Sequence, residues 1–136
     1  MSNVKYIVVA SDHAGYKEKI YLANYLKSQY KEYSIIDVGC DNEDSCDYPD
    51  FAFKGSDKIV ELNKQHKDSA YGVFICGTGI GISIAANRNP DIKCSLVHNI
   101  SEVKLSKSKY SANSIAMGAR VLGKIAMIDI INEFLK

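Results

Sequence analysis

Five short apolar runs recur along the chain, and most of them end at a glycine or a polar turn. In order, they occupy residues 5–11, 33–39, 71–77, 93–98 and 113–118. Buried strands of a parallel sheet have continuous apolar runs of this kind, whereas half-exposed strands alternate apolar with polar residues. The runs therefore predict five strands of a buried parallel sheet.

Helical segments are expected between and after these runs. Ile20, Ala23, Leu26 and Tyr30 recur at steps of three and four residues, which is typical of a helix. Strands that alternate with helices predict a doubly wound α/β domain, with helices on both faces of the sheet. We expect one such domain over residues 1–136. Four further helices are expected: after Pro49, from near Gly81, over 100–109 and over 121–135.

Composition narrows the classes of function. With 136 residues, 46% of them hydrophobic, the chain can bury a sizeable core. A net charge of +1 gives no sign of nucleic acid or an anionic membrane surface as a partner. No apolar stretch could span a bilayer, and the first residues do not resemble a signal peptide. The four cysteines lack zinc spacing, which predicts reduced thiols, no metal and a cytoplasmic location.

The stretch "ICGTGIGISIAANR" (75–88) places Cys76 where a predicted strand meets a glycine loop. Gly77, Gly79 and Gly81 leave backbone N–H groups unobstructed, and the helix that follows adds its positive end. Such a loop should bind an anion or an oxyanion. A dinucleotide fingerprint would need glycine where Ile82 stands, and a P-loop would need a lysine. Both nucleotide interpretations are therefore weak.

A thiol beside a helix N-terminus spends more time as the thiolate, which indicates a chemical role for Cys76. A thiolate next to an oxyanion pocket can remove a proton α to a carbonyl while backbone amides hold the resulting enediolate. The competing chemistry is acyl transfer, with Cys76 as nucleophile and His13 as its base. Cys40, Cys46 and Cys94 precede no anion-binding loop, so we expect structural roles for them.

Polar residues also follow the first two predicted strands, Asp12 and His13 after one and the acidic loop 40–50 after the other. Ligands of open α/β sheets bind at the carboxyl ends of strands, where these groups and Cys76 should meet. Taken singly, Asp12 could simply cap the first helix, and Cys76 could be a small buried hydrophobe. Their coincidence at one sheet edge favours a functional site.

Four segments together resemble the type B ribose-5-phosphate isomerases, in a wider family that includes the galactose-6-phosphate isomerase subunits. The resemblance implies a Rossmann-like three-layer αβα sandwich with a five-stranded parallel sheet. It also implies a sugar-phosphate substrate, no cofactor, and a homodimer, or a dimer of such dimers, with active sites shared between subunits. The four segments are "ASDHAGYKEK" (10–19), "DYPDFA" (47–52), the cysteine loop (75–88), and the N-x-x-x-x-G-x-R pattern of Asn113, Gly118 and Arg120.

The same resemblance implies a role for each site residue. Cys76 would move a proton between C2 and C1 through a cis-enediolate, and Thr78 would act beside it at the sugar ring oxygen. Backbone amides from Gly77 to Gly81 would hold the enediolate oxygens. The remaining contacts fall to Asp12 for sugar hydroxyls, His13 and Arg120 for the phosphate, and Tyr48 for the pocket wall.

One departure concerns the family's His-Asn pair, which opens the sugar ring and here falls on Lys109 and Tyr110. Two alternatives therefore stay open: the cysteine-bearing subunit of a galactose-6-phosphate isomerase, and a phosphosugar-binding module without turnover. The helix expected over 121–135 is apolar around most of its circumference. It has more apolar residues than one sheet face can cover, and these predict an exposed patch at a dimer contact. The partner's Lys109 and Tyr110 would then complete the pocket. That patch comprises Met127, Ile130 and Phe134.

Overall fold

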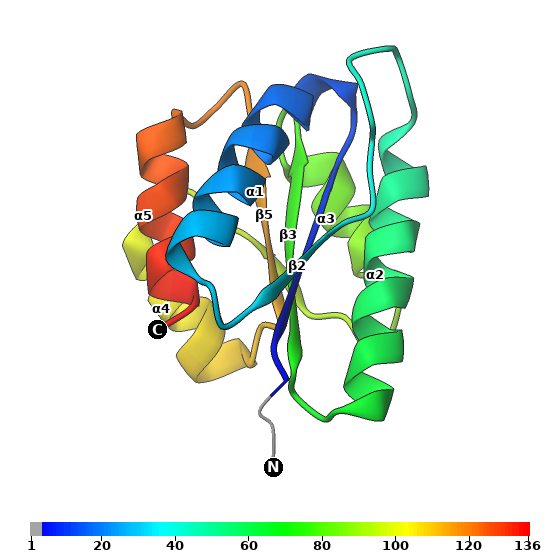
Figure 1. Cartoon of the computed structure of the whole chain (residues 1–136). Coiled ribbons are helices and arrows are strands. Elements are labelled where there is room, and N and C mark those ends of the chain that lie inside the picture. Colours follow the sequence, from blue (N-terminus) through cyan, green and yellow to red (C-terminus); the bar gives the residue numbers. More distant parts are fainter. Residues whose placement is uncertain (1–3) are drawn as a thin grey trace.

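A five-stranded parallel sheet forms the centre of the computed structural model, which describes residues 4–136 (Figure 1). The strand order is β2-β1-β3-β5-β4, and every neighbouring pair is parallel. Each predicted run overlaps one strand, so the prediction of a buried parallel sheet is confirmed. The strands are β1 (Tyr6–Ser11), β2 (Ser34–Asp37), β3 (Ala70–Cys76), β4 (Cys94–Leu96) and β5 (Ser114–Gly118).

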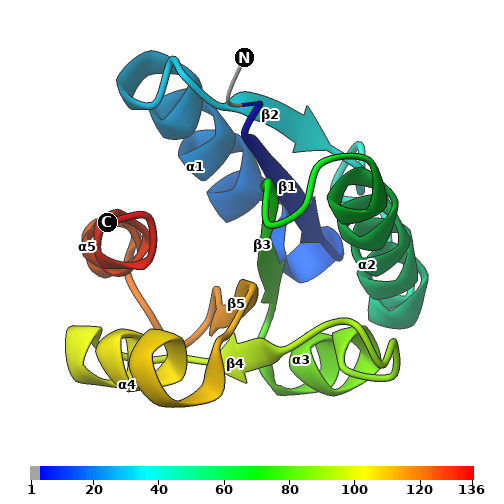
Figure 2. The ribbon, with the colours of Figure 1, turned by 90° about the horizontal axis from the view of Figure 1, so that it is seen from below.

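Helices cover both faces of this sheet, which confirms the predicted three-layer α/β architecture. Helices α1 (Tyr16–Gln29), α4 (Ile100–Tyr110) and α5 (Lys124–Phe134) lie on one face (Figure 2). Helices α2 (Tyr48–Gln65) and α3 (Ile80–Ala86) cover the other. Across residues 4–136, no helix combines the length and the apolar character that a membrane crossing requires.

The two faces of the sheet bury alternate residues of each strand. Ile7 and Val9 of β1 belong to the core cluster that includes residues of α1 and α5, whereas Val8 and Ala10 belong to the cluster that includes residues of α2 and α3. Because both faces are covered, β1 is buried from Ile7 to Ser11, which explains its uninterrupted apolar run.

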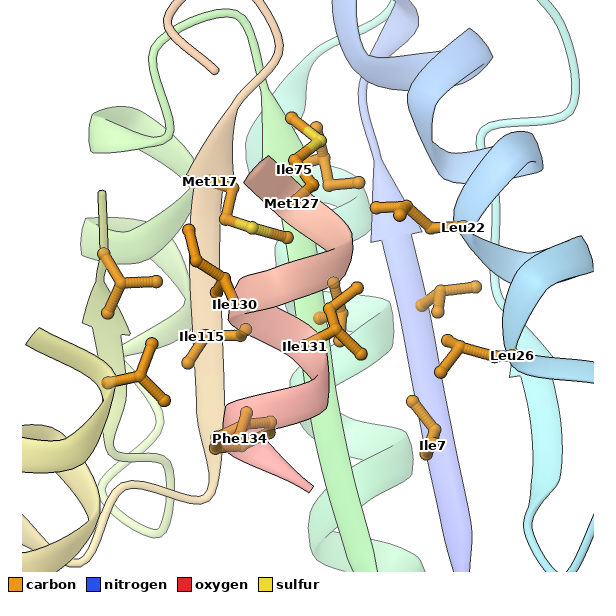
Figure 3. Packing of buried hydrophobic residues seen from close by; sticks show 14 of the residues in the cluster. Ile7, Leu22, Leu26, Ile75, Ile115, Met117, Met127, Ile130, Ile131 and Phe134 are labelled. Carbon is orange, nitrogen blue, oxygen red and sulfur yellow. The ribbon is translucent and has the colours of Figure 1, made fainter. Parts of the chain in front are cut away.

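The prediction of an exposed apolar patch on α5 is wrong. Met127, Ile130 and Phe134 are only 0%, 1% and 3% exposed, and they point into the core between α5 and the sheet (Figure 3). Helix α5 lies between α1 and α4 (Figure 2), so three neighbours bury more of its surface than one sheet face could. Ile125, 77% exposed, is the apolar residue of α5 that faces outward.

The predicted apolar stripe of the first helix is also displaced. Its buried side comprises Lys19, Leu22, Ala23 and Leu26, whereas Ile20 is 36% exposed. The two sets overlap at Ala23 and Leu26, and a lysine occupies the core-facing position where an apolar residue would be expected.

The strand order reverses between β1 and β3. From β1 the chain passes to β2 on one side of the sheet and then returns to β3 on the other. At such a switch point the loops after the two central strands diverge and leave room for a ligand. Asp12 and His13 follow β1, and Cys76 ends β3, so these three predicted site residues come to this point.

Candidate active site

The glycine loop holds the thiol of Cys76 against a backbone amide. Cys76 is 4% exposed, and the N–H of Gly79 donates a hydrogen bond to its Sγ at 3.1 Å. Gly79 has a φ of +79°, and a Cβ there would lie 2.8 Å from the carbonyl carbon of Met117. Only glycine fits this left-handed position, so the aim of the amide at the sulfur depends on Gly79.

The next amide of the loop also has a partner within the chain. The Ile80 N–H donates to Oγ1 of the exposed Thr78 at 3.1 Å. Two of the amides expected to hold an enediolate, those of Gly79 and Ile80, therefore have to exchange these partners for a ligand. Their role toward a ligand stays a prediction.

Asp12 is tied to the end of β3. Its N–H donates to the Ile75 carbonyl at 3.2 Å, and Ile75 directly precedes Cys76. Its Oδ1 accepts from the Gly15 N–H at 3.1 Å, which caps the short 3₁₀ turn η1 (His13–Gly15). Asp12 therefore has a capping role, but for this turn and not for α1, whose N-cap is Gly15. The same contacts hold Asp12, which is 8% exposed, beside β3.

His13 is oriented by the acidic loop. Its Nδ1 lies 3.1 Å from the N of Cys46 and 3.2 Å from the O of Cys46. The amide N–H is an obligate donor, so we assign Nδ1 as the acceptor. A neutral ring then carries its proton on Nε2, the nitrogen that could donate to a ligand.

Arg120 and Tyr48 cover the glycine loop. A Cβ at Gly77 would lie 3.0 Å from Nη1 of Arg120, and a Cβ at Gly81 would lie 2.8 Å from Cζ of Tyr48. The Arg120 N–H also donates to the Gly77 carbonyl at 2.9 Å. The glycines therefore let a guanidinium and a phenol ring approach the backbone next to Cys76.

One chain does not bring Lys109 and Tyr110 to Cys76. Tyr110 ends α4 and lies four residues before Ser114, the first residue of β5, whereas Cys76 pairs with Gly118 at the end of β5. The pair lines a hollow of about 500 Å³ with Cys94 at the opposite edge of the sheet. Only a second subunit could supply these residues to the Cys76 site, so their predicted role stays a prediction.

Comparison with known proteins identifies the family. A family model described as ribose/galactose isomerase matches residues 7–136. The chain belongs to the ribose/galactose isomerase family. It is therefore a sugar-phosphate isomerase, an enzyme that interconverts aldose and ketose forms.

Relatives match the isomerase over most of their lengths. A Rickettsia conorii protein, provisionally named a sugar phosphate isomerase, is 41% identical over 129 residues, which are 95% of this chain and 85% of that protein. The ribose-5-phosphate isomerase B of Clostridium thermocellum matches with a TM-score of 0.88 and 37% identity, covering 96% of this chain and 84% of that one. Ribose-5-phosphate isomerase B of Mycoplasma genitalium, solved with bound ribulose-5-phosphate, matches with a TM-score of 0.85 and 33% identity, covering 96% and 83%.

Two other thiols of the isomerase are held protonated at neutral pH. Burial, together with the neighbouring Cys40 thiol, raises the pKa of Cys46 to about 11. Burial raises the pKa of Cys94 to about 12. All four cysteines carry free thiols. Nowhere in residues 4–136 do three or more histidine, cysteine, aspartate or glutamate side chains gather so as to hold a metal ion.

Lys19 is the residue of the isomerase that sequence reasoning missed. Its ammonium group is buried beside Asp37, on the side of α1 that packs against the sheet. The available signal was its spacing, because Lys19 precedes Leu22, Ala23 and Leu26 by three, four and seven residues. Because a buried lysine needs a paired partner, a lysine at this spacing indicates an ion pair inside the fold.

Proposed function

We propose that this isomerase interconverts ribose 5-phosphate and ribulose 5-phosphate, with Cys76 as the base. The observation that carries the proposal is the 3.1 Å hydrogen bond from the Gly79 N–H to Cys76 Sγ at the switch point of the sheet. An amide that points at sulfur supports negative charge there, as a thiolate base requires. The Mycoplasma genitalium relative with bound ribulose-5-phosphate supports the choice of a pentose.

The proposed reaction moves one proton between two carbons. Cys76 Sγ takes the proton from C2 of the open-chain aldose, and the C1 carbonyl becomes the oxyanion of a cis-enediolate. The hydroxyl proton on O2 passes to O1, and the thiol returns its proton to C1, which yields the ketose. Once sulfur carries the proton, the Gly79 N–H can turn from Sγ to an enediolate oxygen. One amide thus serves the base first and the intermediate next.

Other groups hold the substrate in this proposal. Nε2 of His13 and the guanidinium of Arg120 bind the phosphate, for which the planar arginine fork is well suited. Asp12 accepts from sugar hydroxyls, Thr78 acts at the ring oxygen, and Tyr48 forms the pocket wall. The contacts of Arg120 and Tyr48 with the glycine loop support these roles.

We further propose that the enzyme is a homodimer with shared sites. Lys109 and Tyr110 lie at the wrong edge to act within their own chain, and the partner's pair would complete the pocket. Because the predicted patch on α5 is buried, the dimer contact needs another apolar surface. Ile80 and Ile84 of α3 are 52% and 59% exposed beside the Cys76 loop, and a partner that covers them would reach the site.

Subunit complementation tests the shared site. A Cys76→Ala chain and a chain with Lys109→Ala and Tyr110→Ala are each expected to be nearly inactive. Mixed after reversible dissociation, they should regain part of the activity, because one hybrid site keeps both Cys76 and the Lys109-Tyr110 pair. A fully active monomer in sedimentation would rule out the dimer.

Turnover by the purified chain alone tests the main proposal. Formation of ribulose 5-phosphate from ribose 5-phosphate is the expected result. Binding without turnover would favour a phosphosugar-binding module. Turnover of galactose 6-phosphate that requires a second, different chain would favour the galactose-6-phosphate alternative. An acyl group trapped on Cys76 would instead indicate acyl transfer.

A further inference from the structure

Lys19 carries a buried charge that the proposed mechanism does not use. Its side chain is 1% exposed, and its Nζ donates to Asp37 Oδ1 at 2.6 Å and Asp37 Oδ2 at 2.7 Å. It also donates to the carbonyl of Cys40 at 2.7 Å. Three acceptors meet the three donors of the ammonium group, which is the satisfaction that a buried charge requires.

These acceptors fix the beginning of loop 38–47, which joins β2 to α2 and holds most of the acidic segment predicted as loop 40–50. Asp37 ends β2, and its Oδ1 also accepts from the Gly39 N–H at 2.9 Å. Gly39 and Cys40 then pair with Ser11, whose N–H donates to Gly39 and whose carbonyl accepts from Cys40, both at 2.9 Å. The loop thus starts from a fixed position beside Ser11, the residue before Asp12.

The other end of the same loop orients His13. Residues 41–45 are all exposed, and the Cys46 N–H donates to His13 Nδ1 at 3.1 Å. Cys46 is held from two sides: α2 begins two residues later at Tyr48, and the Cys46 thiol lies beside the thiol of Cys40, where the loop leaves the sheet. The ammonium group of Lys19 holds that departure point.

We propose that Lys19 is a positioning residue for His13. Through Asp37 and the Cys40 carbonyl it sets the course of loop 38–47, and the Cys46 amide of that loop fixes the tautomer and orientation of the imidazole. The phosphate-binding role of His13 rests on the proposed function, whereas its ring orientation does not. Loss of Lys19 should therefore weaken phosphate binding more than proton transfer at Cys76.

Kinetics of Lys19→Met test the proposal, because methionine keeps much of the length without the charge. The KM for ribose 5-phosphate should rise about tenfold, with kcat changed much less. In double-mutant cycles the effect should be less than additive with His13→Ala and additive with Arg120→Ala. Lys27→Met is the matched control, because Lys27 is an exposed lysine in the last turn of the same helix. Wild-type kinetics in Lys19→Met, or full additivity with His13→Ala, would overturn the proposal.

Nitrogen NMR of the histidine rings supplies a readout that needs no activity. In the wild type, His13 should show the Nε2–H tautomer with Nδ1 as acceptor. In Lys19→Met its ring signals should shift toward a mixture of tautomers, while those of His66 and His98 stay in place. Asp37→Asn is the second variant, should Lys19→Met not fold, and the same shift is expected. Unchanged His13 signals would refute the positioning role, whereas absence of turnover in the wild type would refute only the proposed function.

Discussion

Cys76 and Cys94 are two buried thiols at opposite ends of the strands of one sheet, Cys76 at the carboxyl edge and Cys94 at the amino edge. Cys76 ends β3, Cys94 begins β4, and they are 4% and 9% exposed. The Cys76 sulfur accepts a hydrogen bond from Gly79 in the glycine loop. Cys94 sits just beyond the end of α3, where the Asn87 side chain bonds its N–H and its carbonyl, both at 2.8 Å.

Both thiols are buried, so burial alone does not separate the proposed base from a structural cysteine. At the carboxyl edge of a parallel sheet, helices begin and present N–H groups. At the amino edge they end and present carbonyls, which disfavour negative charge. Burial raises the pKa of Cys94 to about 12, although a hydrogen bond with the Ser114 side chain acts in the opposite direction. In the proposed mechanism, the direction of the backbone that follows each strand therefore explains why Cys76 and not Cys94 serves as the base.

The largest expected effect comes from removing the thiol of Cys76. Cys76→Ala should lower kcat on the order of 10²-fold or more, the scale for loss of a positioned general base. Substrate should still bind. Cys94→Ala is the control and should keep nearly full activity. Steady-state kinetics and a binding titration measure both, and near-normal turnover by Cys76→Ala would break the contrast.

A methyl group on Gly79 should disrupt the loop conformation that directs the Gly79 N–H at the Cys76 sulfur. The added Cβ would meet the Met117 carbonyl carbon at 2.8 Å with φ at +79°, so Gly79→Ala should destabilise the fold by about 2 kcal/mol and reduce activity. Gly123→Ala is the matched control, because a Cβ there meets nothing within 4 Å. Urea denaturation compares the two, and equal free energies of unfolding would contradict the role given to Gly79.

We also expect the residue that binds the substrate phosphate, Arg120, at the carboxyl ends of the strands. Arg120→Ala is expected to raise KM for the sugar phosphate about tenfold and to weaken inhibition by inorganic phosphate, because the bidentate fork is lost. Any reaction with unphosphorylated ribose should change little. Arg120→Lys should restore only part of the affinity, because an ammonium group lacks the fork. An equal loss with both sugars would remove Arg120 from the phosphate site.

The sheet and the strand-loop-helix junction at Cys76 could be predicted because both follow from local sequence pattern. Continuous apolar runs indicate strands that are buried on both faces. A cysteine before alternating glycines indicates the end of a strand followed by the start of a helix. The outward side of α5 could not be predicted from its own residues. Met127 and Phe134 are covered by α1, α4 and the sheet together, which only the packing reveals.

Lys19 illustrates a second limit of sequence. Its spacing placed it on the buried side of α1, but a charged residue is ordinarily assigned to solvent. The partner that permits its burial, Asp37, lies 18 residues away at the end of β2. Pairings of this range depend on the strand order, so they become visible only when the fold is known.

The smallest expected effect concerns the alkaline stability of the Cys94 edge. The ordinary thiol pKa is 9.0, and burial raises that of Cys94 to about 12. Between these values the folded protein keeps a proton that the unfolded chain releases, so stability falls as pH rises through 9. The loss from this group should reach about 1 kcal/mol at pH 10. Below pH 9 both states are protonated, and the group has no effect.

Urea denaturation of the wild type and Cys94→Ala at pH 8 and pH 10 measures this effect. Removal of the thiol leaves a small cavity and lowers stability at both pH values, so the decisive quantity is the difference between pH 8 and pH 10. That difference should be smaller in Cys94→Ala than in the wild type. Burial raises the pKa of Tyr30 and Tyr33 as well, and these groups act equally in both proteins. Equal differences would mean that Cys94 keeps an ordinary thiol, and burial at the amino edge would then not separate it from Cys76.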